Sequence, residues 1–433
     1  MKLPEKPINW EKIRYKESQN ISKIIKGNKI LKQIFEYNKR YLYWSELKYR
    51  FKSDSERKYI WVLMKLFRSE KYEPIPFSSI KMKYCLLSDF NRKLHDFDKF
   101  MAGNIETQTR SLGLKQRYII SSLMEEAIAS SIIEGASTTR KVAKAMLREK
   151  RKPRNKSEKM IANNYKTLQF ILDQKNNKIT PELLLEIQTR ITKETLDAPE
   201  DEGRFRDNNE IVVGDNINPE RIIHRPPGYK KIPKLIEDFC NFANEDSEYF
   251  IHPILKGIVL HFLLGYIHPF NDGNGRTARG VFYWYMLSKG YWLFEYMAVS
   301  KRIVRSRTKY DLAYLYTEYD EMDLTYFFKY NIECIDDSLK DMLEHIKRKR
   351  AEQEETKKII YRNPDLNLRQ AIILEEFSKN PNKIFTIKEI SETYRVVYQT
   401  ARTDLLLLAQ KGFIIKKISG KEFVFVYNEW NNN

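Results

Sequence analysis

The chain has 433 residues, of which 42% are hydrophobic and 31% charged, so it can form roughly two to four domains with buried cores. No apolar run is long enough to cross a bilayer, and the start, MKLPEKPINWEK, lacks the apolar segment of a secretory signal. Cys85, Cys240 and Cys334 lie far apart without metal-ligand spacing, as is typical of thiols in a reducing compartment. We therefore expect a cytoplasmic protein with no membrane contact.

The net charge of +19 is concentrated in two stretches. Residues 1–60 hold 16 Lys and Arg against 7 Asp and Glu, and residues 140–160 hold 10 against 2. Such runs can bind nucleic acid or an acidic partner. Solvated helix faces in a lysine-rich sequence explain them more simply, and we assign them no ligand.

Residues 1–110 are predicted to be mostly helical, because apolar positions recur at helical spacing in ILKQIFEYNKRYLYWSEL and RKYIWVLMKLF. Trp10, Trp44 and Trp61 are interleaved with lysines, a pattern that also suits stacking on bases. Aromatic side chains at helical spacing are far more often core residues, so we predict that these tryptophans are buried.

Three helices are predicted next. Residues 117–136 form an amphipathic pattern that ends near Gly135, and residues 157–174 and 180–196 follow with helical periodicity. Thr180 followed by proline is a favourable start for the last of them. We expect these helices to complete a bundle around the segment described below.

Residues 203–229 have a different pattern. Two short β-rich runs, Glu210–Val213 and Arg221–His224, are separated by GDNINPE, which is rich in turn residues. This segment therefore predicts a hairpin or a pair of short strands.

The densest group of reactive side chains lies in HPFNDGNGRTAR, residues 268–279. Apolar, helix-like runs precede it (Ile254–Ile267) and follow it (Thr277–Leu287), so we predict a helix, a tight loop and a second helix. Gly273 and Gly275 let the backbone turn sharply and approach a ligand closely. The second helix then begins with free N–H groups and the positive end of its dipole, which suits phosphate.

Four side chains of this segment add charge and acid–base chemistry. Arg276 and Arg279, three residues apart, share one face of the first helical turn and can bind phosphate oxygens. Asp272 is an oxygen ligand of the kind that Mg²⁺ prefers together with substrate phosphates. His268 is a base whose unperturbed pKa lies near neutrality, beside the anion site. The residues alone therefore indicate a nucleotide phosphate site with a general base at its rim.

The same twelve residues match the Fic signature H-x-F-x-[D/E]-G-N-G-R-x-x-R at every specified position, so the chain resembles the Fic family. Members typically transfer AMP from ATP to a hydroxyl side chain of a target protein. The resemblance implies a mainly α fold, a helical bundle with a small β-hairpin flap, and Mg²⁺-dependent transfer to Ser, Thr or Tyr. It assigns proton removal to His268, Mg²⁺ to Asp272, and the phosphates to Gly273, Asn274, Gly275, Arg276 and Arg279.

The resemblance extends to Ser130-Ser-Ile-Ile-Glu134-Gly135, which matches the inhibitory motif [S/T]-x-x-x-E-[G/N] of the family. In relatives this glutamate reaches an arginine of the phosphate loop, which corresponds here to Arg279. Glu134 would neutralise that arginine and take the space of the ATP γ-phosphate, so the α-phosphate would be wrongly aimed. The resemblance therefore implies autoinhibition, with Ser130 and Glu134 as the inhibitory residues.

Fic proteins also carry a flap beside the active site that pairs with the backbone of the target segment, a case of β-augmentation. The resemblance assigns this role to residues 203–229, with Ile211, Val212 and Val213 as the edge. It further suggests that residues 1–110 frame the active site or present a partner surface. Use of another nucleotide or of phosphocholine stays open, because the base pocket is not readable in the sequence.

Residues 366–433 are predicted to form a separate domain after a charged segment, 351–365, which is a linker or the end of a long helix. Three helical segments followed by a hairpin that turns at Ser-Gly-Lys resemble a winged helix-turn-helix. The side chains expected to face a DNA groove are Gln399, Thr400, Arg402 and Thr403 on the third helix and Lys416, Lys417 and Lys421 on the wing. Residues 365–433 hold 10 Lys and Arg against only 8 Asp and Glu, and DNA affinity comes largely from a positive surplus. DNA binding through residues 366–430 and protein docking are therefore equally open.

Together these patterns predict a helical N-terminal domain (1–110), a Fic catalytic domain (111–350), a linker (351–365) and a winged helix-turn-helix (366–433). We expect an autoinhibited protein adenylyltransferase that uses ATP and Mg²⁺. Two alternatives stay open: removal of AMP by the same site, with Glu134 positioning water, and a DNA-binding transcriptional regulator in which Fic chemistry is secondary. The sequence does not identify the target protein, and it leaves a homodimer open.

Overall fold

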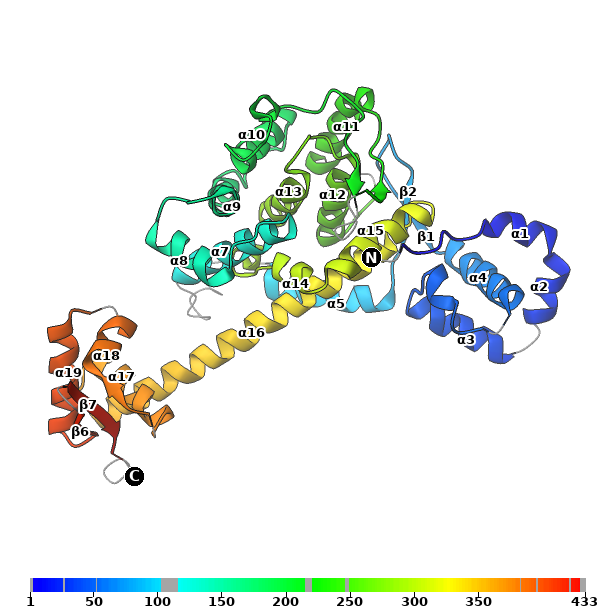
Figure 1. Ribbon diagram of the computed structural model, residues 1–433. Coiled ribbons are helices and arrows are strands. Elements are labelled where there is room, and N and C mark those ends of the chain that lie inside the picture. Colours follow the sequence, from blue (N-terminus) through cyan, green and yellow to red (C-terminus); the bar gives the residue numbers. More distant parts are fainter. Residues whose placement is uncertain are drawn as a thin grey trace. The chain divides into compact units, whose positions relative to one another are not determined.

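Helices form most of the computed structural model, and the strands that it describes make three small sheets (Figure 1). The structure describes residues 3–25, 28–51, 53–102, 116–214, 220–245, 249–381, 383–394, 396–419 and 422–428. Within these ranges, no helix combines the length and the apolar composition needed to span a bilayer. The chain divides into two units, Met1–Met342 and Leu343–Asn433. The mainly α fold expected from the sequence is confirmed.

The first unit begins with helices and one β-hairpin. These elements are α1 (Trp10–Lys16), α2 (Ser18–Ile25), α3 (Asn28–Lys39), the 3-10 helix η1 (Trp44–Leu47), α4 (Asp54–Ser69), β1 (Tyr72–Ile75), β2 (Met82–Cys85) and α5 (Ser88–Met101). The antiparallel pair β1 and β2 was not predicted from the sequence. Pro74 obscures the first strand, because proline is tolerated only where a strand edge needs no N–H donor.

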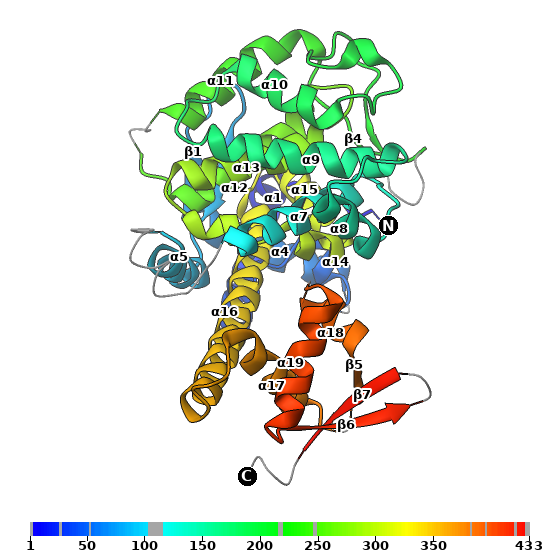
Figure 2. The same ribbon diagram turned by 90° about the vertical axis from the view of Figure 1, so that its left-hand side faces the viewer.

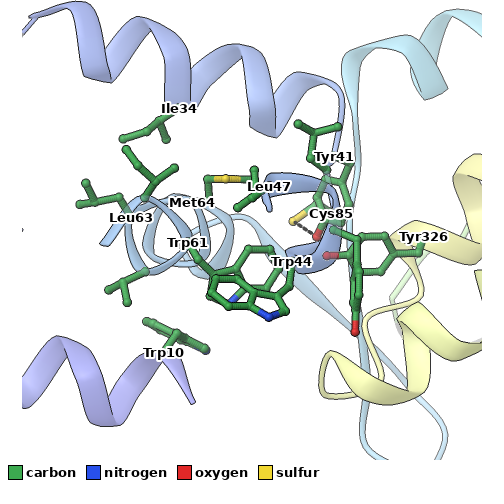
Figure 3. Packing of buried hydrophobic residues seen from close by; sticks show 14 of the residues in the cluster. Trp10, Ile34, Tyr41, Trp44, Leu47, Trp61, Leu63, Met64, Cys85 and Tyr326 are labelled. Carbon is green, nitrogen blue, oxygen red and sulfur yellow. Dashed lines mark hydrogen bonds between the residues drawn. The ribbon is translucent and has the colours of Figure 1, made fainter. Parts of the chain in front are cut away.

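The tryptophans of this region are core residues, as predicted. Trp10, Trp44 and Trp61 are all buried, and Trp44 and Trp61 meet edge to face with ring centroids 5.9 Å apart (Figure 3). Tyr326, from a helix far along the chain, joins the same apolar cluster. Burial at helical spacing thus explains the aromatic content without a nucleic-acid ligand.

Buried polar contacts also fasten these N-terminal helices to the rest of the first unit. The hydroxyl of Tyr41 donates to Asp323 (2.6 Å), and the ammonium of Lys65 pairs with Asp320 (2.8 Å). A buried charge requires such a partner, since leaving it unpaired would cost several kcal/mol, on the order of 3–5. The predicted boundary near residue 110 stays a prediction.

The central part of the first unit is a helical bundle with a short hairpin. Its elements are α7 (Gln116–Ile133), α8 (Arg140–Glu149), α9 (Lys156–Asp173), α10 (Pro181–Thr192), η2 (Pro199–Asp201), β3 (Val213–Gly214), β4 (Ile222–His224), η3 (Tyr229–Lys231), α11 (Ile232–Asn244), α12 (Pro253–Ile267), α13 (Asn274–Ser288), η4 (Trp292–Tyr296), α14 (Ser300–Arg305) and α15 (Arg307–Tyr319). The side chain of Thr180 caps α10 by accepting from the Leu183 N–H (3.2 Å), and Pro181 occupies the first helical position, as predicted.

α12 and α13 are the most buried helices of this bundle. Nearly every residue of both is buried, which is the pattern of a helix surrounded by protein on all sides. α9 and α10 pack against α13, α11 packs against α12, and α7 contacts both α9 and α13 (Figure 2). The loop between α12 and α13 is therefore held between rigid elements.

The long helix α16 (Thr325–Arg362) begins in the first unit and ends in the second. It includes most of the segment 351–365, which the sequence left open as a linker or the end of a long helix. The residues there, such as Ala, Glu, Gln, Lys and Arg, are strong helix formers, so their charge does not prevent a helix.

Among the described residues, the second unit contains the end of α16, the three helices and the hairpin expected from the sequence, and a further strand, β5, that was not expected. The elements after α16 are α17 (Leu368–Lys379), β5 (Phe385–Thr386), α18 (Ile387–Tyr394), α19 (Tyr398–Gln410), β6 (Ile414–Ser419) and β7 (Glu422–Tyr427), with sheet order β5-β7-β6. Phe385 and Thr386 form the short strand β5 directly before α18. Thr386 still caps α18, accepting from the Glu389 N–H (3.1 Å). Lys421, expected on the wing, lies outside the described residues.

Candidate active site

The loop between α12 and α13 is fixed by one asparagine. Asn274 accepts from the Phe270 N–H (2.9 Å) and donates to the Phe270 carbonyl (2.7 Å), which closes the turn. Phe270 is fully buried and stacks on Phe205, with ring centroids 5.4 Å apart. The Asn274 side chain therefore holds the shape of the loop, and Asn274 is also the first residue of α13.

His268 ends α12 in the left-handed conformation (φ 48°, ψ 59°). Its Nδ1 lies 3.1 Å from the carbonyl of Gly265, which can only accept, so the proton of the neutral ring is on Nδ1. Nε2 is then left with a lone pair. Burial lowers the pKa of His268 to about 4, with further lowering from the charges of His224 and Arg206. The imidazole is thus neutral at pH 7, the state that a general base needs.

α10 supports the next part of the loop. Gly273 has φ +84°, and a Cβ there would lie 2.8 Å from Thr192. Arg276 donates to the carbonyl of Ile191 (3.2 Å), and Gln188 donates to the carbonyl of Asp272 (3.3 Å). Glycine is therefore required at 273 both by conformation and by the close approach of α10. Sequence reasoning missed Gln188. The only feature of the sequence that points to a role for this residue is its position as a polar side chain on the apolar face of a helix.

Arg276 is almost fully buried, with 1% of its surface exposed. Its nearest acidic partner is Asp272, with 3.6 Å between Nη2 and Oδ1, and among the described residues its Nε has no hydrogen-bond partner. Burial lowers the pKa of this guanidinium, although Asp272 and Glu134 oppose the shift. The protein compensates the charge only in part, which is the situation expected where an anionic ligand supplies the remainder.

Arg279 is held by the end of α7. Its Nε donates to the Ser130 hydroxyl (2.8 Å), and its Nη2 donates to the Ser130 carbonyl (2.9 Å) and to Glu134 Oε1 (2.8 Å). Burial by itself would raise the pKa of Glu134, but the charges of Arg279 and Arg307 outweigh it and lower the pKa. Ser130 and Arg279 are buried, the Glu134 side chain is 29% exposed, and the three residues form one hydrogen-bonded group, the meeting that the inhibitory motif predicted.

The Glu134 carboxylate also lies directly on the start of α13. A Cβ added to Gly275 would be 2.1 Å from Glu134 Oε1, so glycine is what lets this oxygen approach the backbone. The N-terminus of a helix attracts anions through its free N–H groups and its dipole. Glu134 thus occupies space that the sequence assigned to a nucleotide phosphate.

Asp272 is the candidate magnesium ligand. Its side chain is about half exposed, and Oδ1 accepts from the Gly273 N–H and faces Arg276. Among the described residues no protein donor bonds to Oδ2, and no cluster of three or more acidic, His or Cys side chains could form a metal cage. A single accessible carboxylate fits Mg²⁺ bound mainly through substrate phosphates, and it does not fit a metal held by protein alone.

The hairpin of residues 203–229 forms, but its ladder is short. β3 and β4 are antiparallel with a bulge, and Val213 pairs with His224. Of the three residues predicted as the docking edge, Val213 lies in β3, whereas Ile211 and Val212 precede the strand and are half-buried. Residues 215–219, the predicted turn, lie outside the described residues. The docking role stays a prediction.

Two side chains of this hairpin segment contact the end of α12 and the first residue of the loop 268–279, and neither contact was predicted. Arg206 donates to the carbonyl of His268 (2.8 Å), and His224 Nε2 bonds to the carbonyl of Tyr266 (2.8 Å). Sequence reasoning gave His224 no catalytic role and did not single out Arg206, because neither contact follows from local spacing.

The helical bundle brings together a helix N-terminus, two buried arginines, an accessible carboxylate and a neutral histidine, an arrangement suited to binding a nucleotide phosphate. Residues 178–286 match the model of the Fic/DOC family, so this part of the chain is a Fic domain. The match includes α10, the hairpin and the whole loop 268–279.

Curated relatives and solved structures agree with this assignment. The chain is 32% identical over 126 residues to "Protein adenylyltransferase Fic" of Culex quinquefasciatus, which is 29% of this chain and 23% of that protein. It is 29% identical over 177 residues to the protein of the same name from Nematostella vectensis, covering 39% and 38% of the two chains. The chain therefore spans less than half the length of these relatives.

Two crystal structures share the fold. A Fic family protein from Desulfovibrio desulfuricans G20 superposes with a TM-score of 0.54 at 16% identity, covering 80% of this chain and 96% of that one. Fic-1 (residues 134–508) from C. elegans gives 0.52 at 19% identity, covering 74% and 86%. The bundle described above is thus a Fic fold.

Proposed function

We propose that this chain is an autoinhibited protein adenylyltransferase that transfers AMP from ATP to a Ser, Thr or Tyr hydroxyl of a target protein. The observation that carries the proposal is the position of Glu134. Its carboxylate pairs with Arg279 (2.8 Å) and covers Gly275 at the start of α13. The adenylyltransferase names of the curated relatives support the same activity.

His268 acts as the general base. Its Nε2, left free by the bond from Nδ1 to Gly265, takes the proton of the target hydroxyl. The hydroxyl oxygen then attacks the α-phosphorus, a new O–P bond forms, and the bond from the α-phosphorus to the bridging oxygen breaks. AMP remains on the target, and pyrophosphate leaves with the electron pair.

The start of α13 binds the phosphates. The backbone of Asn274 and Gly275 presents N–H groups, that of Gly273 would join them once its bond to Asp272 is released, and the buried Arg276 supplies positive charge close to them. Asp272 would hold Mg²⁺, which neutralises charge on the α- and β-phosphates when bound. Because these groups are fixed before substrate arrives, little reorganisation is needed in the transition state.

Autoinhibition follows from competition for Arg279. In the structure, Arg279 donates hydrogen bonds to Ser130 and to Glu134, and the Glu134 carboxylate lies where we expect a phosphate to bind. We propose that Arg279 binds the γ-phosphate once Glu134 moves away. With Glu134 in place, ATP would bind with its α-phosphate displaced, and a displacement of about 1 Å can cost roughly 10²-fold in rate.

The hairpin provides the target site. Val213, together with Ile211 and Val212 before it, would pair with an extended target segment and bring its hydroxyl to His268. The half-buried state of these three residues is compatible with such an edge. We infer no identity for the target.

The test uses ATP labelled at the α-phosphate, Mg²⁺, and the purified full chain. Glu134→Gly should label protein strongly, wild type weakly, and the double variant Glu134→Gly/His268→Ala not at all, because a general base contributes about 10²–10⁴-fold. Label should appear on the chain itself or on proteins of a lysate.

A matched control is Glu125→Gly, which removes a carboxylate from the same helix. Glu125 pairs with Arg140 and Lys144 and does not contact the loop, so this variant should label as weakly as wild type. If Glu134→Gly stays as silent as Glu125→Gly across several lysates and with other nucleotides, the adenylyltransferase proposal is wrong.

A further inference from the structure

Flap residues 206 and 224 supply partners to four consecutive carbonyls at the end of α12. Arg206 Nε donates to the carbonyl of His268 (2.8 Å), its Nη2 to that of Ile267 (3.4 Å), and its backbone N–H to that of Pro269 (2.9 Å). His224 Nε2 bonds to the carbonyl of Tyr266 (2.8 Å). The last carbonyls of a helix have no hydrogen-bond donor within the helix, and here the hairpin segment provides the donors.

Arg206 is unusual because it is buried without an acidic partner. It is 3% exposed, and all the side-chain hydrogen bonds found for it among the described residues go to backbone carbonyls. Besides the end of α12, these belong to Asn208 (2.8 Å) and Pro227, which lie on the two sides of the hairpin base. The negative end of the α12 dipole partly compensates the charge. A planar guanidinium with five N–H donors can join so many acceptors, whereas a lysine ammonium cannot.

His224 adds a second link from the hairpin. Its Nδ1 lies 2.8 Å from the carboxylate of Glu318 on α15, and its Nε2 faces the Tyr266 carbonyl. Each ring nitrogen of His224 therefore faces an oxygen that accepts hydrogen bonds. The hairpin is thereby fixed to α15 on one side and to the end of α12 on the other.

The conformation of His268 needs such support. A non-glycine residue with φ near +48° is strained and persists when its surroundings hold it. The bond from Arg206 to the carbonyl of His268 restrains the backbone on one side of the residue. The bond from His268 Nδ1 to Gly265 restrains the ring.

We propose that Arg206 is a positioning residue for His268: by joining the base of the flap to the His268 carbonyl, it holds the general base in its reactive orientation. This inference rests on the proposed adenylyltransferase function. It also links target binding to catalysis, since a target strand paired with the flap would act on the segment whose Asn208 and Pro227 carbonyls hold Arg206.

The charges around His268 give the proposal a specific signature. Glu134, from α7, favours the imidazolium, whereas Arg206 and His224 disfavour it, with Glu318 behind His224. Removing the charge at 206 should therefore raise the pKa of His268. Because the reaction needs the neutral ring, the acid limb of the rate profile should move to higher pH.

The experiment introduces Arg206→Met and Arg206→Lys into the active Glu134→Gly background. Both should lower kcat by roughly 10–10²-fold while leaving the Kd for ATP unchanged, because the base is displaced and the phosphate site is not. Only Arg206→Met should shift the acid limb, since lysine retains the charge. Arg204→Met is the matched control: Arg204 is exposed and pairs with Asp201 (3.0 Å), so no change is expected.

A second measurement does not depend on activity. In the full chain with ¹³C,¹⁵N-labelled histidine, NMR should show the His268 proton on Nδ1 in wild type, and a raised pKa with mixed tautomers in Arg206→Met. If Glu134→Gly fails to transfer AMP while these signals change as expected, the proposed function falls and the positioning role stands. If transfer occurs and both 206 variants match Arg204→Met in kcat, acid limb and His268 signals, the positioning role is overturned. Should Arg206→Met not fold, an Arg206→Lys variant with unreduced kcat would overturn it as well.

Discussion

The loop 268–279 lies between two helices, whereas the C-terminal unit combines three helices with a small sheet, and the two regions place charge differently. In the loop, Arg276 and Arg279 are buried, and their charges are matched by carbonyls, by Asp272 at a distance, and by a carboxylate from another helix. In the C-terminal unit, the buried carboxylate of Asp404 pairs with Arg369, whose side chain is 38% exposed, so this charge is matched within the fold.

The exposed surface of the C-terminal unit differs as well. Val397 and Tyr398, at the start of α19, are 71% and 55% exposed, and Ile418 on β6 is 73% exposed. A buried charge that its protein partners match only in part therefore indicates the charge of a missing ligand, because burying such a charge without a ligand is costly. Exposed apolar side chains indicate a contact surface but leave the class of partner open.

The largest effect is expected at Arg276. In the Glu134→Gly background, Arg276→Met should reduce kcat/KM for AMP transfer by about 10²–10³-fold, because it removes a buried donor from the phosphate site. Arg190→Met is the control, since Arg190 is on the exposed face of α10 and pairs with Glu186. Thermal unfolding would separate lost chemistry from lost structure. Retained transfer by a folded Arg276→Met protein would remove this arginine from the phosphate site.

Asp404 offers the corresponding test in the C-terminal unit. It is 2% exposed and accepts from Arg369 and from Gln370 (3.1 Å), so Asp404→Ala should destabilise that unit by about 3 kcal/mol. AMP transfer by Glu134→Gly should not change. Hydrogen exchange of α17 and α19 amides measures the effect. Asp365→Ala serves as control, because Asp365 is 82% exposed in its pair with Lys411. Equal exchange in the two variants would contradict a structural role for the buried pair.

A smaller effect, on the free energy of unfolding, is expected from substitutions at Gly275 and Glu134. In wild type, Gly275→Ala would force a methyl group against Glu134 and should cost about 1–3 kcal/mol in the free energy of unfolding. In a Glu134→Ala background the same change should stabilise by about 0.5–1 kcal/mol, since alanine is the better helix former.

Urea unfolding of the four proteins gives the coupling energy between the two positions. Gly280→Ala is the matched control on the same helix: its Cβ would meet Ile171 (3.2 Å) and not Glu134, so its effect should be the same in both backgrounds. Additive effects at Gly275 and Glu134 would mean that the carboxylate does not rest on α13 in solution.

The smallest effect is expected from the third helix of the C-terminal unit. Arg402→Ala should change the affinity of the full chain for a random DNA duplex by less than about twofold, because residues 365–433 carry 10 Lys and Arg against 8 Asp and Glu. Fluorescence anisotropy at two salt concentrations measures this. A large loss of affinity, with the salt slope reduced by about one, would instead assign α19 to DNA.

Much of the site could be predicted because its residues are close in sequence. The order His268, Asp272, Gly273, Gly275 and Arg276 defines the loop by local turn and helix chemistry alone. The meeting of Glu134 with Arg279 was also predicted, but from the resemblance to Fic proteins. The structure adds the atoms involved, and these explain why glycine stands at 275.

The supporting contacts could not be predicted in this way. Arg206 and Gln188 are separated from the loop by 62 and 84 residues in the chain, and each binds backbone carbonyls that any sequence would offer. The β1–β2 hairpin was missed because proline interrupts its first strand. Val213 was found in a strand while Ile211 was not, since ladder length depends on pairing partners and not on β propensity alone.

Under the proposed function, the contact of Glu134 with the start of α13 means that the protein carries its own competitor for ATP. A carboxylate tethered to the folded chain acts as a ligand at an effective concentration on the order of millimolar or above, and it is never diluted. Even a weak ion pair can then compete with a nucleotide that binds tightly. Basal activity would then be set by how firmly Glu134 is held at the end of α7. Arg307→Ala, which removes a bond to the Ile133 carbonyl (2.6 Å) and a positive charge that acts on Glu134, would raise that activity without changing the loop 268–279.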